Sequence, residues 1–256
     1  MTEAAPSLSV TVLRGIPLVA EGMDLPSLIA DAAAQAGVLI GAHDVVVVAQ
    51  KIVSKAEGRT VDLASVAAEP QALILAAQTG RPAALAQLIL DEALAVLRAT
   101  PQAIVTRHRT GHVTANSGID ASNVAGGADG TVLLWPRDPD ASARAIRAGL
   151  TARPAVVIAD SLGRAWRQGT LGTAIGCAGL IHTDDQRGQS DMFGRVLQAT
   201  VVAVADAIAA MAVLAMGEGA EGTPVAIVRG AGRWVTAEDG PGAAAIMRPA
   251  EGDLFP

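Results

Sequence analysis

The sequence predicts a mixed fold of the α/β type with α+β character, formed by a single chain of 256 residues. Three observations support this prediction. Short runs of β-branched residues, such as Val45–Ala49 and Val225–Val228, indicate buried strands. Alanine-rich segments of helical spacing, such as Thr200–Met216, lie between them. No internal repeat or low-complexity linker interrupts the chain, so strands and helices are expected in one sheet-containing unit.

The strands are predicted from short apolar runs, most of them bounded by turn residues. The run at Val45–Ala49 is apolar on both faces, as in a covered sheet. His108 and His112, on either side of a polar turn, are expected at the surface or in the hairpin rather than as metal ligands. In chain order we expect an extended segment at 8–19 with a break at Gly15–Pro17, then strands at 45–49, 102–106, 112–115, 131–134, 154–158 and 225–228.

The helices are predicted from capping residues, prolines and apolar stripes. Asp91 and Glu92 are expected on the polar face of their helix. The predicted helices are one capped by Asp24 that runs to Gly37, a partly helical stretch at 62–79 with a break at Pro70, a helix at 82–97, one at 143–150 capped by Asp140 or Ser142, and one at 200–216. Residues 240–256 are rich in glycine and proline, and we expect this tail to be partly flexible.

Composition limits the classes of partner. Hydrophobic residues make up 51% of the chain but aromatic residues only 2%, so the core has to be aliphatic. Stacking platforms for bases are nearly absent and the formal net charge is −6, which argues against nucleic acid as a partner. An anionic ligand would need metal ions or a few placed Arg and Lys side chains to balance its charge.

Cysteine content and hydropathy predict the compartment. The single cysteine, Cys177, excludes an internal disulfide and fits a reducing environment. The N-terminus lacks the pattern of a signal peptide. The longest apolar segment, Val201–Met216, contains Asp206 and is too short to cross a bilayer. We therefore expect a cytoplasmic protein that has no membrane partner.

The stretch around Asp160 carries the most unusual chemistry. An apolar strand, Pro154–Ile158, is expected to be followed at its carboxyl end by Ala159–Gly169, a stretch with a carboxylate, a hydroxyl, glycines and two arginines. Asp and Ser oxygens suit a hard divalent cation, and guanidinium groups suit phosphate or carboxylate. An ordinary capping turn is the alternative for Asp160 and Ser161 taken alone.

Three further loops resemble the first in their chemistry. Asp120 follows a predicted strand, and Glu218 and Glu221 lie in a glycine-rich loop whose backbone N–H groups suit phosphate. Lys51 and Lys55 follow the strand at 45–49 and are spaced to share a helical face. Each loop alone could be a solvated turn, a basic loop or a helix terminator. Together they fit two divalent cations and a triphosphate. Thr173–Gly179 is rich in small residues, which suggests either close backbone packing or close approach to a ligand.

At this point the residues resemble a known family, the F420-0:γ-glutamyl ligases, also called coenzyme F420:L-glutamate ligases. Six blocks in the same order carry the resemblance, at 15–18, 50–59, 118–124, 160–169, 185–195 and 216–224, together with an ending at 248–255. The resemblance implies one ligase domain over residues 1–256, without the fused oxidoreductase domain of some relatives. It also implies an unusual mixed-sheet fold and an intertwined homodimer.

The resemblance further implies a GTP-dependent ligase that adds L-glutamate, and further γ-linked glutamates, to coenzyme F420-0 through an acyl phosphate. It implies two Mg²⁺ or Mn²⁺ ions and a stimulating K⁺. By motif, the residues expected to act are Lys55, Asp120 and Asp160 in catalysis; Asp120, Asp160, Ser161 and Glu218 at the metals; and Gly15, Ile16, Pro17, Leu18, Gln50, Lys51, Lys55, Asn123, Gly217, Glu218, Gly219, Ala220, Glu221, Gly222 and Thr223 at GTP.

The sequence indicates less clearly which residues bind the acceptor substrate than which residues bind GTP and metal. Arg164, Arg167 and Arg195 are hypothesised to bind the F420-0 phosphate or glutamate carboxylates. Two alternatives remain open. One is a related GTP- and metal-dependent amide ligase for a different carboxylate, and the other is a nucleotide-binding relative without turnover.

Overall fold

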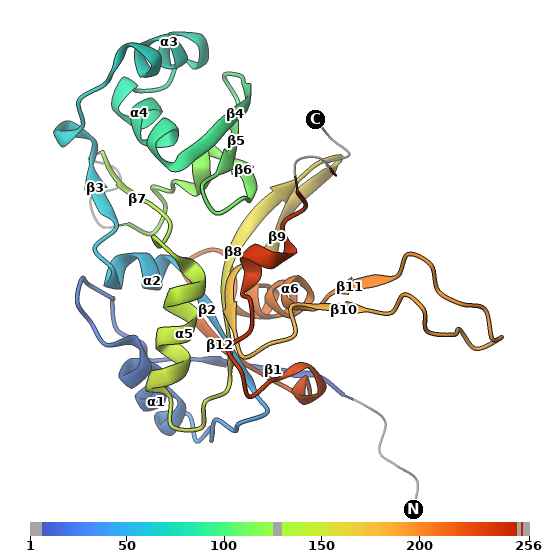
Figure 1. The fold of residues 1–256 in the computed structure, drawn as a ribbon. Helices are drawn as coiled ribbons and strands as arrows, with labels where there is room; N and C mark the ends of the chain where they lie inside the picture. The colour runs from blue at the N-terminus through green and yellow to red at the C-terminus, as the bar shows by residue number, and fades with distance from the viewer. Residues whose placement is uncertain (1–6, 125–129, 250–251, 253–256) are drawn as a thin grey trace, which may run out of the picture.

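A five-stranded mixed sheet forms the centre of the molecule (Figure 1). The structure is a computed structural model, and it describes residues 7–124, 130–249 and 252. Across the sheet the strands are β1 (Ser9–Leu13), β12 (Val225–Arg229), β2 (Val45–Ala49), β8 (Ala155–Arg164) and β9 (Arg167–Ala178). Only β2 and β8 pair in parallel, and the other neighbours are antiparallel. The predicted mixed α+β class is therefore confirmed.

The two faces of this sheet are both covered, which explains why β2 reads as an uninterrupted apolar run. Side chains alternate between faces along a strand. Val46 and Val48 pack with α1 (Leu25–Gln35), α2 (Gln50–Ala56) and α5 (Pro139–Gly149), whereas Val45 and Val47 pack against α6 (Val204–Met216). The parallel pair β2–β8 is thus buried on both sides, and Ala49 at the carboxyl end of β2 lies beside Ala159 in β8.

A smaller group of elements lies above the main sheet in Figure 1. It contains helices α3 (Pro70–Thr79) and α4 (Ala83–Glu92) and a three-stranded sheet of β4 (Ala93–Ala99), β5 (Ile104–His108) and β6 (Val113–Ala115). The antiparallel pair β3 (Thr60–Asp62) and β7 (Thr131–Leu133) connects this group to the main sheet. Short 3₁₀ turns occur at Leu63–Ser65, Asn116–Gly118, Gly232–Trp234 and Ala243–Ile246.

The predicted helix at 82–97 is wrong in its second half. The helix ends at Glu92, and residues 93–99 form β4, which pairs with β5 from Ala93 opposite His108. Pairing with β5 decides the conformation here, since apolar spacing over a few residues fits either structure. The predicted polar face is also wrong for Glu92, which is buried, although Asp91 is exposed.

The predicted end of the strand at Ile158 is also wrong. Strand β8 continues through Asp160 and Ser161 because β9 supplies partners, with Asp160 opposite Thr173. The chain reverses only at Ala165–Trp166, where Trp166 has a φ of 64°. Asp160 and Ser161 therefore lie inside a long strand, not in a turn at its end. The small residues of β9 do pack closely, since a Cβ at Gly176 would lie 2.4 Å from the Pro139 backbone.

Several other predictions need correction. The side chain of Asp138, not of Asp140 or Ser142, caps α5 through the N–H of Ala141. Asp140 is buried and accepts backbone hydrogen bonds from the distant Cys177 and Ala243. These long-range contacts could not be read from local sequence. They also hold the start of the tail, which is ordered around Ala243–Ile246; residues 250–251 and 253–256 lie outside the described residues.

The histidine prediction and the last helix also change. His108 and His112 lie in the β5–β6 hairpin, one of the two predicted places, but they are buried rather than at the surface, because both rings pack on Trp135. The helix predicted at 200–216 begins at Val204, because residues 201–203 form β11 and pair with β10 (Thr183–Asp185). This pair forms the base of an arm that projects from the body in Figure 1.

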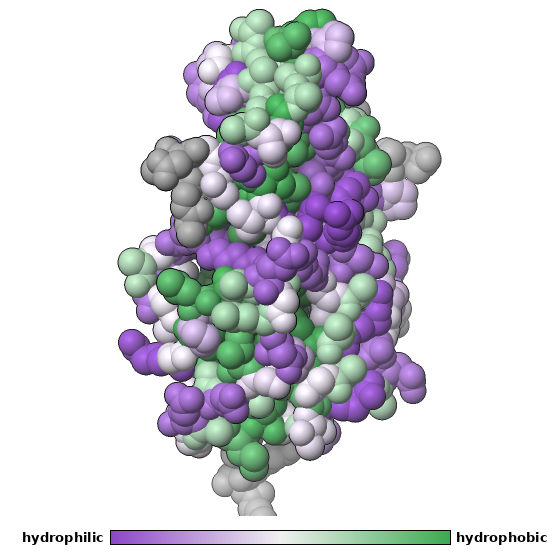
Figure 2. Space-filling view, turned by 90° about the vertical axis from the view of Figure 1, so that its left-hand side faces the viewer, coloured by the Kyte–Doolittle hydropathy of each residue, from purple (hydrophilic) through white to green (hydrophobic). Residues whose placement is uncertain are grey.

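Hydropathy over the described ranges gives little sign of a membrane. No single helix there has the length and apolar character to cross a bilayer; only α3 and α4 taken together do, and they are bent by 113°. Figure 2, which shows the side that carries α1, α2 and β3, has a band of hydrophilic residues across its middle with hydrophobic residues above and below it.

Candidate active site

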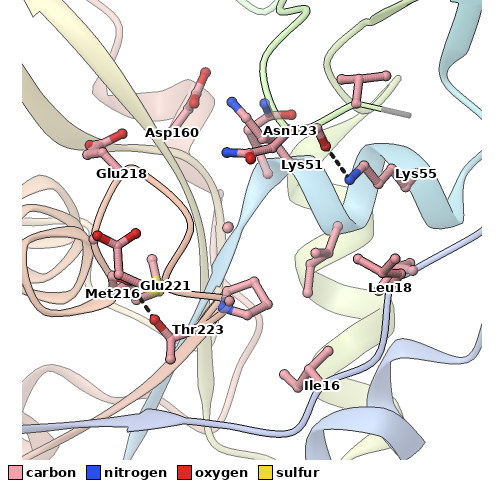
Figure 3. A pocket seen from close by; sticks show the side chains of 18 of the residues that line it. Ile16, Leu18, Lys51, Lys55, Asn123, Asp160, Met216, Glu218, Glu221 and Thr223 are labelled. Atoms are coloured by element: carbon pink, nitrogen blue, oxygen red, sulfur yellow. Dashed lines mark hydrogen bonds between the residues drawn. The ribbon is translucent and has the colours of Figure 1, made fainter. Parts of the chain in front are cut away.

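A cavity of about 830 Å³ opens beside the carboxyl end of β2 and the neighbouring residues Ala159–Ser161 of β8. Ligands of open sheets commonly bind at this edge. The segments that line the cavity come from distant parts of the chain: residues 16–21, the start of α2, Asn123, Asp160–Ser161 and the loop at 217–224. Figure 3 shows side chains from these segments pointing toward a shared space. The structure therefore brings together most of the residues predicted from the sequence.

Asp160 is the most strongly perturbed group in this cavity. One of its oxygens accepts a hydrogen bond from Trp135 Nε1 at 2.8 Å, and the other accepts from the Ser161 N–H at 2.9 Å. Burial raises the pKa of Asp160 to about 6, although the positive charge of Lys51 opposes this shift. A desolvated carboxylate of this kind is stabilised by a nearby cation.

Ser161 connects the strand to the glycine-rich loop at 217–223. Its Oγ donates to Glu218 Oε2 at 2.8 Å, so the hydroxyl and two carboxylates lie at one end of the cavity. The loop is fixed internally by a hydrogen bond from the Gly219 N–H to Glu221 and by one from Thr223 Oγ1 to the Met216 carbonyl. The loop therefore has a defined shape with exposed backbone, as phosphate sites require.

Asp120 lies behind Lys51, outside the residues that line the cavity. Lys51 Nζ donates to its carboxylate, and Ser122 donates from both its backbone N–H and its hydroxyl. Burial alone would raise the pKa of Asp120, but these donors outweigh it and the pKa is lowered. Asp120 is thus ionised and paired with a lysine at the cavity wall.

Lys55 lies one helical turn beyond Lys51 on α2, as the four-residue spacing predicts. Its Nζ donates to the Asn123 carbonyl at 2.7 Å, and Asn123 Nδ2 donates to the Gly219 carbonyl at 3.2 Å (Figure 3). Burial and the neighbouring Lys51 charge lower the pKa of Lys55. These contacts join three walls of the cavity around two cationic groups.

Gln50 supplies a buried donor at the base of α2. Its side chain is 1% exposed, and its Oε1 accepts from Ser54 Oγ. The Nε2 group has no hydrogen-bond partner within the described residues. A buried N–H group without a partner is costly, so a ligand acceptor at this position would be stabilising.

Sequence reasoning missed the residues that position Asp160. Trp135 packs in the core against His108 and His112, and Gly118 has to be a glycine because a Cβ there would lie 2.4 Å from the indole. Arg59 Nε donates to the Trp135 carbonyl, and its Nη2 pairs with Glu92 at 2.6 Å. The only sequence signal was a tryptophan in a chain almost without aromatic residues.

Glu92 is the acidic centre of this network. Arg59 and Arg109 both donate to it, and His108 Nε2 lies 3.4 Å away. Burial alone would raise its pKa, but the nearby His108 ring and the hydrogen bonds from Arg109 and Arg59 lower the pKa to about 2. The network thus joins α4 and β5 to the Trp135 that holds Asp160.

Five predicted residues are not at the cavity surface. Gly15 immediately precedes the lining residue Ile16, and Asp120 contacts the cavity through Lys51. Arg164 and Arg167 flank the turn between β8 and β9, and Arg195 lies on the exposed arm between β10 and β11. None of these three arginines lines the cavity of its own chain.

The oxygen ligands at this end of the cavity suit a hard cation, but they are too few to fill its coordination sphere. Among the described residues, no group of three or more His, Cys, Asp or Glu side chains is close enough to hold a metal ion by itself. Asp160, Ser161 and Glu218 offer carboxylate and hydroxyl oxygens side by side. Mg²⁺ is commonly bound by one or two carboxylates together with waters and substrate phosphates, so an open set of this kind fits it.

The fold and this cavity define an enzyme that acts on small molecules, with a carboxylate-rich end and cationic groups around one space. The chain belongs to the F420-0:Gamma-glutamyl ligase family, whose sequence model matches residues 15–230, and it is a ligase. It is 42% identical over 252 residues to a protein named coenzyme F420:L-glutamate ligase from Methanothermobacter thermautotrophicus, covering 97% of this chain and 98% of that one.

Two further relatives with the same name support this assignment. The protein from Halobacterium salinarum is 44% identical over 221 residues, which is 84% of each chain. The protein from Methanocaldococcus jannaschii is 40% identical over 216 residues, covering 83% of this chain and 84% of the relative. The family resemblance stated from the sequence is therefore confirmed.

Proposed function

We propose that this chain is a GTP-dependent ligase that adds L-glutamate, and then further γ-linked glutamates, to coenzyme F420-0. The names of the relatives support ligation of L-glutamate to coenzyme F420. The observation that carries the rest is the cavity itself, where Asp160, Ser161 and Glu218 form one end and Lys51 and Lys55 lie next to it. Cationic groups and oxygen ligands in one space are what triphosphate chemistry requires.

Two Mg²⁺ or Mn²⁺ ions would be held by Asp120, Asp160, Ser161 and Glu218. When bound, such ions neutralise phosphate charge so that an anionic nucleophile can approach the γ-phosphate. Lys51 now pairs with Asp120 and would have to release this carboxylate for it to become a ligand. No described group favours K⁺ over other cations, and a stimulating K⁺ stays a prediction.

The GTP would lie along the lining segments 15–18, 50–55 and 217–223, with Asn123 between them. The buried Nε2 of Gln50 would gain an acceptor on binding. Lys55 would contact phosphate oxygens, since burial of its ammonium favours a nearby anion. The backbone of the glycine-rich loop would provide further N–H donors.

In the proposed reaction, a carboxylate oxygen of the acceptor attacks the γ-phosphorus of GTP, and the bond to the GDP oxygen breaks. The amine of glutamate then attacks the acyl carbon of this acyl phosphate. Phosphate leaves, the amine loses a proton, and an amide is formed. The protein contributes placement and charge more than a covalent nucleophile. Cys177 is buried and its pKa is raised to about 12, which fits an inert thiol.

A homodimer is part of the proposal. The hairpin β8–β9 and the arm β10–β11 expose large apolar side chains, with Trp166 at 88%, Met192 at 96% and Phe193 at 89% exposure. Exposed apolar groups on projecting segments indicate contact with another chain. The same two segments carry Arg164, Arg167 and Arg195. These arginines would therefore bind the F420-0 phosphate or glutamate carboxylates at the cavity of a second copy. Size-exclusion chromatography with light scattering would test the dimer.

Mass spectrometry tests the function directly. F420-0 incubated with the protein, GTP, L-glutamate and Mn²⁺ should gain one or more glutamyl units, and Asp160→Ala should abolish the gain. GTP binding without product would direct the search to another carboxylate acceptor. GTP binding without GDP release for any acceptor would indicate a relative without turnover. Absence of GTP binding in the presence of metal would refute the proposal.

A further inference from the structure

Glu21 lines the cavity, on a segment whose backbone is tied to α2. The Gly22 N–H donates to the Ala56 carbonyl at 2.9 Å, which joins this segment to the end of α2. The Glu21 carboxylate packs over Gly58, where a Cβ would lie 2.5 Å from Glu21 Cδ. Gly58 has a φ of 65° and lacks a side chain, so it leaves room for this carboxylate. The position of Glu21 is thus set by α2.

The carboxylate of Glu21 is not used in the fold. Across 7–124, 130–249 and 252, no hydrogen bond or ion pair engages it, while the two lysines of the cavity have other partners in Asp120 and Asn123. A solvated carboxylate without a structural role, at the edge of a ligand cavity, provides two acceptor oxygens for a ligand with two adjacent donors.

Its place relative to the charged groups indicates which part of a ligand it faces. Lys51 lies in the first turn of α2, whereas Gly58, against which Glu21 packs, lies beyond the end of this helix at Ala56, so Glu21 and Lys51 are at opposite ends of α2. Ile16 and Leu18 line the cavity on the same segment, and Leu18 is 93% exposed. Phosphates would be repelled by Glu21 and attracted by Lys51 and Lys55. A flat, neutral group would cover the apolar side chains beside Glu21.

We propose that Glu21 selects guanine by accepting hydrogen bonds from N1–H and the N2 amino group of the base. The inference rests on the proposed use of GTP and adds the residue that distinguishes it from other nucleotides. Guanine presents these two donors side by side, whereas adenine presents an acceptor, N1, next to a single donor. Two carboxylate oxygens therefore match guanine and repel adenine. The base lies against Ile16 and Leu18, and the triphosphate extends toward Lys51.

The test is calorimetric binding of GTP, ITP, XTP and ATP, each with Mn²⁺, to the full chain and to Glu21→Gln. Wild type should bind GTP about a hundredfold tighter than ATP, with ITP between them because hypoxanthine lacks the N2 amino group. Glu21→Gln should weaken GTP about a hundredfold and should strengthen XTP, because the amide can accept from N1–H and donate to the C2 carbonyl of xanthine. A gain for XTP would exclude misfolding as the cause.

Glu57→Gln is the matched control. Glu57 immediately precedes Gly58 at the end of α2, does not line the cavity and accepts from Ser142, which a glutamine can also do. This variant should bind all four nucleotides as wild type does. If wild type binds GTP and Glu21→Gln keeps both its GTP and its XTP affinity, the role of Glu21 is refuted while the proposed function stands. If wild type binds no GTP with metal, both are wrong.

Discussion

The two walls that meet at the carboxylate-rich end of the cavity are built in different ways. Asp160 and Ser161 belong to β8, which pairs with β2 and β9 and is covered on both faces. The other wall, residues 217–223, is a glycine-rich loop held by a few hydrogen bonds, of which those from Ser161 and Asn123 cross the cavity. One wall is therefore fixed before any ligand binds, and the other has freedom to adjust.

The difference indicates that the strand wall holds its side chains in more precise positions than the loop wall does. Groups that must be held within fractions of an ångström belong on rigid elements with supporting hydrogen bonds. Asp160 has such support from Trp135, and Trp135 in turn from Arg59 and Glu92. Loop residues can close over a ligand because little of their backbone is tied to the core. The following predictions, from the largest expected effect to the smallest, test this comparison.

The largest effect is expected from neutralising the strand carboxylate. Asp160→Asn should lower kcat/KM for glutamate addition about 10³-fold, because under the proposed function this buried carboxylate would hold a cation at the reacting phosphates. Glu218→Gln, on the loop, should cost only about tenfold, because the loop can shift and water can replace one oxygen. GDP release measures both. Equal losses in the two variants would contradict the contrast between the walls.

The next effect is on stability. Glu92→Gln should lower the free energy of unfolding by roughly 3 kcal/mol, because Arg59 keeps its burial but loses its charged partner. Asp91→Asn, its exposed neighbour, should be nearly neutral, since an asparagine oxygen can still accept from Gln87. Urea unfolding compares the two variants. A neutral Glu92→Gln would mean that the network does not support the strand wall.

The same network predicts a pH dependence. The pKa of Glu92 is lowered to about 2 from an ordinary 4.5, so its stabilising contribution is complete above about pH 4.5 and is lost as the pH falls toward 2. Wild type should therefore lose stability more steeply over this window than Glu92→Gln. Parallel pH profiles of the two proteins would show that the folded-state pKa of Glu92 is not depressed.

Removing the indole N–H should have a smaller effect on activity. Trp135→Phe keeps an aromatic ring against His108 and His112 but removes the donor to Asp160. Because outer partners of metal ligands commonly contribute 10–100-fold, we expect kcat to fall by about that factor. Mn²⁺ affinity, measured by calorimetry, should fall with it. Unchanged Mn²⁺ affinity would show that Trp135 serves packing alone.

The smallest effect is expected at the loop wall. Asn123→Ala removes the hydrogen bond from Nδ2 to the Gly219 carbonyl but leaves the backbone carbonyl that Lys55 contacts. A single exposed bond contributes about 1 kcal/mol, so the KM for GTP should rise a few-fold with little change in kcat. A large fall in kcat instead would mean that the loop is as finely positioned as the strand.

Much of this molecule could be predicted from local pattern. The runs at 45–49, 131–134 and 225–228 form strands because β-branched residues are compatible with burial on both faces of a sheet. Lys51 and Lys55 share a helical face because four residues make about one turn. Glycines and carboxylates in separate loops indicated the cavity, and the order of the motifs indicated the family. Such signals depend only on residues close in sequence.

Only the tertiary structure decided the remainder. Whether Asp160 lies in a turn or inside a strand depends on β9, and whether residues 93–99 form helix or strand depends on β5. Glu92 has the local sequence pattern of a surface residue, but it is buried and accepts hydrogen bonds from Arg59 and Arg109. Trp135 reached Asp160 from 25 positions away, and Glu21 faced the cavity because α2 fixed it there. The physical reason is that burial, strand pairing and long-range hydrogen bonds are properties of the packed chain, which no local segment carries by itself.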